Sequence, residues 1–142
     1  MKLGNLLAHL RQLEYGLADS LRAAAARHSD DHDVFHQCRT FATRATMRSE
    51  TLDTAGDQYP GMAEWASAVS RESDDLLEDL RALHLRLREV AITWEMAAQA
   101  AKAARDGDLV ALSTDAQSEV EMHAKWIETR IKTSAPQAFL VA

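Results

Sequence analysis

The chain has 142 residues, of which 46% are hydrophobic and 27% are charged, so we expect one globular domain over residues 1–142. Its net charge of −6 and its lack of a basic block exclude a typical nucleic-acid-binding protein, and no run approaches the roughly 20 apolar residues that cross a bilayer. The single Cys38 excludes an internal disulfide, and the N-terminus lacks a signal-peptide pattern, which together predict a cytoplasmic protein.

The first half of the sequence predicts two amphipathic helices. Over about 2–28, apolar side chains recur every three or four residues, which is the spacing of one helix face. This stripe comprises Leu3, Leu6, Leu10, Leu13, Leu17, Leu21 and Ala24. A polar break follows, where Asp30 or Asp31 can cap a second helix over about 32–55. The predicted inner face of this second helix comprises Phe35, Cys38, Ala42, Ala45, Ser49 and Leu52.

A long connection over about 56–73 separates the two halves of the chain. It contains two glycines and one of the two prolines, and a short helical turn is expected around 62–69. A third helix is predicted over about 74–105, with Ser73 or Asp74 as its cap and acidic residues in its first turn, where the helix dipole favours them.

The fourth helix is predicted over about 109–134. Gly107 is placed for a left-handed cap at the end of the preceding helix, and Asp108 is placed to cap this one. Pro136 is expected to end the helix. The remaining tail, 136–142, is apolar, so we expect it to dock against this chain or against a partner.

Connection lengths predict how the four helices are arranged. Short turns near residues 29 and 107 make helices 1 and 2, and helices 3 and 4, antiparallel neighbours. The long connection allows helix 3 to start at the opposite end of the molecule. We therefore predict an all-α fold, an antiparallel four-helix bundle with one long crossover between helices 2 and 3. An up-down-up-down bundle is the alternative.

Three sequence features add to this pattern: Glu14 in helix 1, Glu95 in helix 3 and the stretch EVEMH at 119–123 in helix 4. With them, the chain resembles the ferritin-like superfamily over nearly its full length. The resemblance implies a di-metal site, with one Glu from each of two helices and a Glu-x-x-His from each of the other two. Carried onto this sequence, the metal ligands would be Glu14, Glu95, Glu119 and His123, and the metal would be iron or manganese.

The sequence departs from that family pattern in two helices. Helix 2 reads TRATMRSETL where Glu-x-x-His would stand, and Glu119 and His123 are four residues apart instead of three. Arg48 lies at the edge of the helix 2 stripe. An inward carboxylate must be paired, so we predict a degenerate metal site in which Arg48 forms a core salt bridge with Glu14 and Glu95. No cofactor is expected on this interpretation.

Other candidate sites are weaker. His32 and His36 are spaced to bind zinc or nickel together, but a polar helical turn explains them as well. Cys38 has no second cysteine nearby, which favours a buried apolar role. Trp65, Trp94 and Trp126 could line a ligand pocket, although aromatic residues on helical stripes are more often core residues. There is no glycine-rich phosphate loop and no nucleophile motif.

Three functions are compatible with this sequence. The first is a non-catalytic bundle that acts through protein interaction or self-association, with a dimer expected. The second is a metal-binding ferritin-like protein, an iron or manganese oxidase or store, with a reduced ligand set. The third is a small-molecule binder that uses the core of the bundle.

Overall fold

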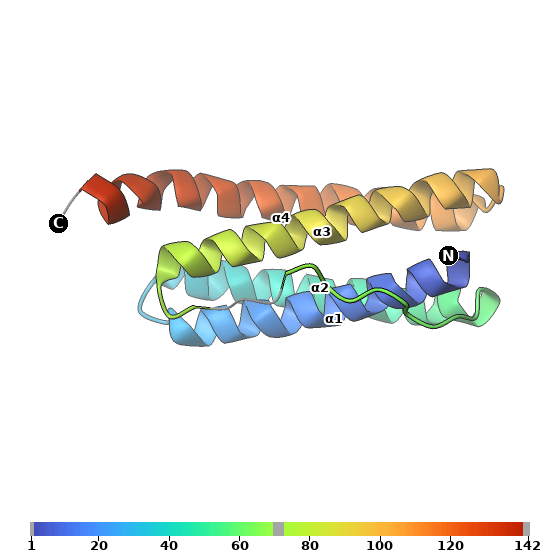
Figure 1. The fold of residues 1–142 in the computed structure, drawn as a ribbon, viewed down its shortest axis with the longest axis horizontal. Coiled ribbons are helices and arrows are strands. Elements are labelled where there is room, and N and C mark those ends of the chain that lie inside the picture. The colour runs from blue at the N-terminus through green and yellow to red at the C-terminus, as the bar shows by residue number, and fades with distance from the viewer. Residues whose placement is uncertain (1, 70–72, 141–142) are drawn as a thin grey trace.

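The computed structural model describes residues 2–69 and 73–140, and it confirms the predicted all-α bundle of four helices (Figure 1). The helices are α1 (Leu3–Arg27), α2 (His32–Gln58), α3 (Leu76–Ala103) and α4 (Gly107–Leu140). The described residues contain no strand. None of these helices is long and apolar enough to span a membrane, as far as the described residues go.

The colours of Figure 1 show that α2 and α3 run in one direction and that α1 and α4 run in the other. Two tight turns join α1 to α2 and α3 to α4, at opposite ends of the molecule. The connection between α2 and α3 runs along the outside from one end of the bundle to the other. In cross-section, α1 packs on α2 and α3, and α4 packs on α3 and α2.

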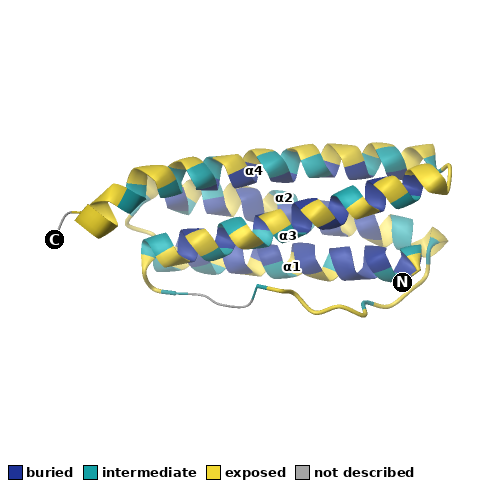
Figure 2. Ribbon diagram, turned by 45° about the horizontal axis from the view of Figure 1, so that its top comes forward, coloured by how far each residue is buried: buried dark blue, intermediate teal, exposed yellow. Residues whose placement is uncertain are grey.

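The core is formed by the inward stripes of the four helices, coloured dark blue in Figure 2. Its largest fully buried side chains include those of Trp94, Leu10, Leu17, Leu21, Leu52, Leu80, Leu87 and Ile127. These apolar side chains leave water on folding and supply most of the driving force. Charged groups inside such a core must be paired, and the few that occur here are therefore the first place to look for function.

The crossover, residues 59–75, begins with a close crossing of two backbones. A Cβ atom on Gly4 would lie 2.2 Å from the carbonyl oxygen of Pro60, and one on Gly61 would lie 2.3 Å from the carbonyl carbon of Gly4. Only glycine allows this approach. The side chain of Asn5 holds the crossing in place, because its Oδ1 accepts from Met62 N at 3.0 Å and its Nδ2 donates to Glu64 at 2.8 Å.

The helical turn expected at 62–69 is wrong, because these residues form no helix. Trp65 packs edge-on against His9 of α1, and Glu89 of α3 accepts hydrogen bonds from Ser67 and Ala68. Distance explains the difference. Eight residues cover about 12 Å as a helix but about 26 Å when extended, and the crossover must travel the length of the bundle.

The turn between α3 and α4 lies about two residues earlier than the sequence predicts. Arg105, not Gly107, adopts the left-handed conformation, with φ of 56°. Its N–H bonds Lys102 O at 3.1 Å and the N–H of Asp106 bonds Ala101 O at 3.0 Å, which is the Schellman pattern. Asp106 then caps α4 by accepting from Leu109 N at 3.0 Å, so the predicted cap at Asp108 is wrong.

Other helix ends differ from the prediction in ways that have physical causes. Asp31 caps α2, accepting from Val34 N at 3.1 Å, but α3 is capped by Asp75 in place of Ser73 or Asp74. Helix α4 continues past Pro136 to Leu140. Proline has a helical φ and removes only one N–H, so a solvated final turn can contain it.

Candidate functional site

The centre of the bundle holds a buried ion pair between α1 and α2. Arg48, 5% exposed, donates from Nε to Glu14 Oε2 at 2.5 Å and from Nη2 to Glu14 Oε1 at 3.0 Å. Glu14 is completely buried, and its Oε2 also accepts from Trp94 Nε1 of α3 at 3.1 Å. This two-point contact is the strongest geometry available to a guanidinium and a carboxylate.

A second carboxylate from α4 completes the group. Arg48 donates from Nη1 to Glu119 Oε1 at 2.6 Å, and Arg44 donates from Nε to Glu119 Oε2 at 2.9 Å. One arginine therefore links α1, α2 and α4, while Trp94 adds α3. We call Glu14, Arg44, Arg48, Trp94 and Glu119 the central arginine group.

Burial and pairing act against each other in this group. Burial raises the pKa of Glu14 above its ordinary value, even though Arg48 and Trp94 donate to its carboxylate. Burial works to raise the pKa of Glu119 as well, but the hydrogen bonds from Arg44 and Arg48 outweigh it, so that pKa is lowered. Burial works to lower the pKa of Arg48, but its bonds to Glu14 and Glu119 raise it overall, and the guanidinium stays charged.

His123 lies beside the central arginine group in a largely apolar setting. Its ring stacks on Phe41 with centroids 4.0 Å apart, and the ring of Trp126 packs edge-on against Phe41 with centroids 5.9 Å apart. Burial, aided by the positive charge of Arg48, lowers the pKa of His123 to about 4. Its Nδ1 is buried without a hydrogen-bond partner among the described residues. The imidazole is therefore neutral at pH 7.

We expect acid to destabilise the protein through His123. Between pH 6.5 and pH 4 the unfolded histidine binds a proton that the folded one does not, so stability falls as pH falls through this window. The expected loss is on the order of 2 kcal/mol of unfolding free energy. Urea unfolding at pH 7 and pH 4.5 measures it, and H123Q should lose that share of the pH dependence. The control H32Q, at an exposed histidine, should keep it; an unchanged pH dependence in H123Q would contradict the assignment.

Of the four predicted metal ligands, Glu14 and Glu119 both bind Arg48 and His123 lies beside them, but Glu95 lies apart. Glu95 is half-buried on α3 and accepts a hydrogen bond from Gln99 Nε2 at 3.0 Å, one helical turn away. The predicted salt bridge between Glu95 and Arg48 is wrong, because Glu95 stands one residue past the inward-facing Trp94 on α3. Within the described ranges, no cluster of three or more His, Cys, Asp or Glu side chains is placed to hold a metal ion.

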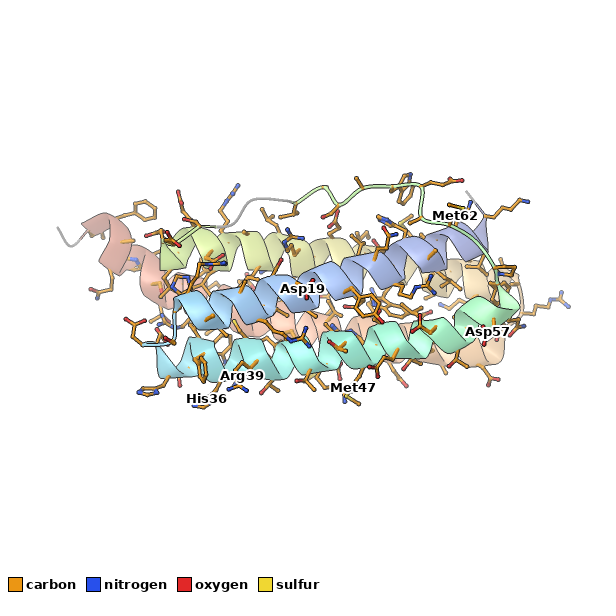
Figure 3. All side chains as sticks on the ribbon, turned by 90° about the horizontal axis from the view of Figure 1, so that it is seen from below. Asp19, His36, Arg39, Met47, Asp57 and Met62 are labelled. Carbon is orange, nitrogen blue, oxygen red and sulfur yellow. The ribbon has the colours of Figure 1, made fainter. Side chains whose placement is uncertain are left out.

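The remaining candidates from the sequence lie elsewhere. His32 and His36 are both exposed at the start of α2, and Figure 3 shows His36 on the outside of the bundle. Cys38 is fully buried, and burial raises the pKa of its thiol to about 12, which favours the unreactive thiol over the thiolate. A further histidine, His84 on α3, is half-buried, with Nδ1 3.3 Å from Ala124 O.

A surface pocket of about 190 Å³ between α2 and α4 reaches the central arginine group. Arg44, Arg48 and Glu119 line it together with Met47, Thr51, Leu112, Asp115 and Ala116. It is smaller than the roughly 300 Å³ at which ligand pockets usually begin. The pocket leads to carboxylate oxygens that arginines already bind.

A second buried ion group lies at the end of the bundle where α3 begins. Asp79, 1% exposed, accepts from Arg27 Nη2 at 2.8 Å and from Arg27 Nε at 3.1 Å. His28 Nε2 lies 2.9 Å from Asp79 Oδ2. This group was not predicted from the sequence, although Asp79 stands at stripe spacing between Leu76 and Leu83, which is a signal for an inward-facing side chain.

Comparison with known proteins adds no assignment: no family model, no curated protein and no solved structure matches this chain.

Proposed function

We propose that this chain is a non-catalytic bundle of the ferritin-like kind that functions by binding protein. The observation that carries the proposal is the end of α4. The last turns of α4 project beyond the other three helices (Figure 1), and they carry Phe139 and Leu140, whose side chains are 78% and 83% exposed. Large apolar side chains on a projecting helix are typical of a protein contact.

The interior of the bundle supports this proposal. In a ferritin-like metal site, inward carboxylates are shared by metal ions. Here Arg48 takes both oxygens of Glu14 and one oxygen of Glu119, and Arg44 takes the other oxygen of Glu119. The guanidinium supplies the positive charge that a metal would supply, so the acids are neutralised by the chain. We therefore assign the function to the surface of the molecule and not to its core.

Site-specific photo-crosslinking tests the proposal. A benzoyl-phenylalanine at position 139 of the full chain, expressed in its own host, is expected to give covalent adducts of defined mass. The same probe at position 122 is the control, because Met122 is 68% exposed but stands on the part of α4 that packs along the other helices. Adducts from position 139 and none from position 122 support a binding end. The absence of any adduct from position 139 would refute the proposal.

A further inference from the structure

The apolar stripe of α4 continues past the end of the bundle that it packs against. Val120, Ala124 and Ile127 are buried, and Ile131, Ala135, Ala138 and Phe139 extend the same three-and-four spacing. From Gln137 onward every described residue is exposed. These four residues extend the helix by about 6 Å at 1.5 Å per residue. A helical end of this kind has little stability alone and gains it by packing on another surface.

A groove lies directly beside this projecting end. It measures about 400 Å³ and runs between the start of α3 and the last turns of α4. Its lining comprises Asp75, Leu76, Leu77, Arg130, Thr133, Ser134, Gln137 and Ala138. Phe139 and Leu140 of the same chain are not among the residues that line it. The molecule thus presents an apolar projection and an apolar groove side by side.

The charges around the two features are opposite. The start of α3 carries Asp74, Asp75 and Glu78, all exposed. At the end of α4, Arg130 lines the groove and already binds Asp31, whereas Lys132 is 68% exposed and its Nζ lies only at the outer limit of an ion pair, 3.9 Å from Glu128. No acidic residue stands between Glu128 and Leu140, so Lys132 is the cation of this end that a second copy can reach. Two copies placed head to head would bring the basic α4 end of each one onto the acidic α3 start of the other.

Resting on the proposed function, we infer that the protein bound by the α4 end is a second copy of this chain. A two-fold axis places Phe139 and Leu140 of each copy in the α3–α4 groove of the other, and Lys132 of each beside Asp74 of the other. Because the projection and the groove are adjacent on each copy, one symmetric contact fills both grooves and covers both projections. A partner with a different sequence would need a projection of its own to fill this groove and a groove of its own to receive Phe139 and Leu140.

Sedimentation equilibrium of the full chain from about 5 to about 500 µM tests this inference, because that range brackets micromolar dissociation constants. The wild type is expected to show a monomer–dimer equilibrium. The double variant F139S/L140S should weaken association at least tenfold, and the control M122S should leave it unchanged. Circular dichroism of each variant checks that the bundle is folded, and all three positions are solvent-exposed.

A charge exchange between copies provides the second arm. K132E and D74K should each weaken the dimer, because each puts like charges together at both contacts of the homodimer. An equimolar mixture of the two variants should regain association, since both contacts of the mixed dimer pair Glu with Lys or Lys with Asp. An interaction within one chain would not be rescued by mixing.

The outcomes separate this inference from the proposed function. A wild type that stays monomeric, or a dimer that F139S/L140S leaves intact, overturns the second copy as partner. Failure of the mixed charge variants to regain association overturns the two-fold arrangement. Crosslinks from position 139 to a different protein, with no crosslink between copies, would uphold a protein-binding end and refute self-association.

Discussion

Replacing Arg48 by methionine is expected to lower the free energy of unfolding by about 3–5 kcal/mol, the range seen when one partner of a buried ion pair is removed. Methionine preserves much of the side-chain volume, but it leaves Glu14 with only the Trp94 donor inside the core. Glu14 must then either stay charged without a cation or take up a proton. The penalty should therefore grow as pH rises.

Urea unfolding followed by circular dichroism at pH 7 measures this effect. The matched control is R44M on the same helix: Arg44 is half-exposed, pairs with Glu119 at the surface, and should cost less than about 1 kcal/mol. The double variant R48M/E14L removes both buried charges and should recover most of the loss. If R48M and R44M destabilised the protein equally, the buried pair would not have the role assigned to it.

Replacing Asp79 by asparagine is expected to cost about 2–3 kcal/mol, because a buried group loses charge-assisted hydrogen bonds. Asparagine keeps the size of the side chain but removes the negative charge that Arg27 and His28 face. Arg27 is partly solvent-accessible and can regain water, so the loss should be smaller than that for R48M.

Thermal unfolding of D79N against E78Q provides the comparison. Glu78 is the preceding residue on the same helix, but it is exposed, and its carboxylate accepts only from Ser73 among the described side chains. Its neutralisation should change stability by no more than about 0.5 kcal/mol. If D79N were as stable as E78Q, the negative charge of Asp79 would not contribute to stability through its contacts with Arg27 and His28.

Much of the fold was predictable because the periodic stripes are long. The stripe from Leu3 to Ala24 predicts α1 almost to the residue, because seven apolar positions at helical spacing are not compatible with a strand or a loop. The ends were less predictable. Arg105 adopts a conformation that glycine prefers, and the short turn compels it through two backbone hydrogen bonds that no local pattern reveals.

The central group was partly predictable for the same reason. Arg48 at the edge of a stripe indicates an inward cation, and Glu14 within a stripe indicates an inward acid. The identity of the second acid depends on how each helix is rotated about its axis, which the sequence gives to about one residue. On α3 that one residue decides the outcome, because Trp94 points into the core and the next residue, Glu95, bonds Gln99. Asp79 required knowing that the end of α1 meets the start of α3, which is a long-range fact.

We expect an arginine of the chain, and not a metal ion, to neutralise the buried carboxylates. A crystal structure of untagged protein soaked in manganese, with an anomalous difference map, distinguishes the two. The predicted result is Arg48 bound to Glu14 and Glu119, with no anomalous peak at either carboxylate. A peak between Glu14 and Glu119 or His123, with Arg48 displaced from both acids, would contradict it.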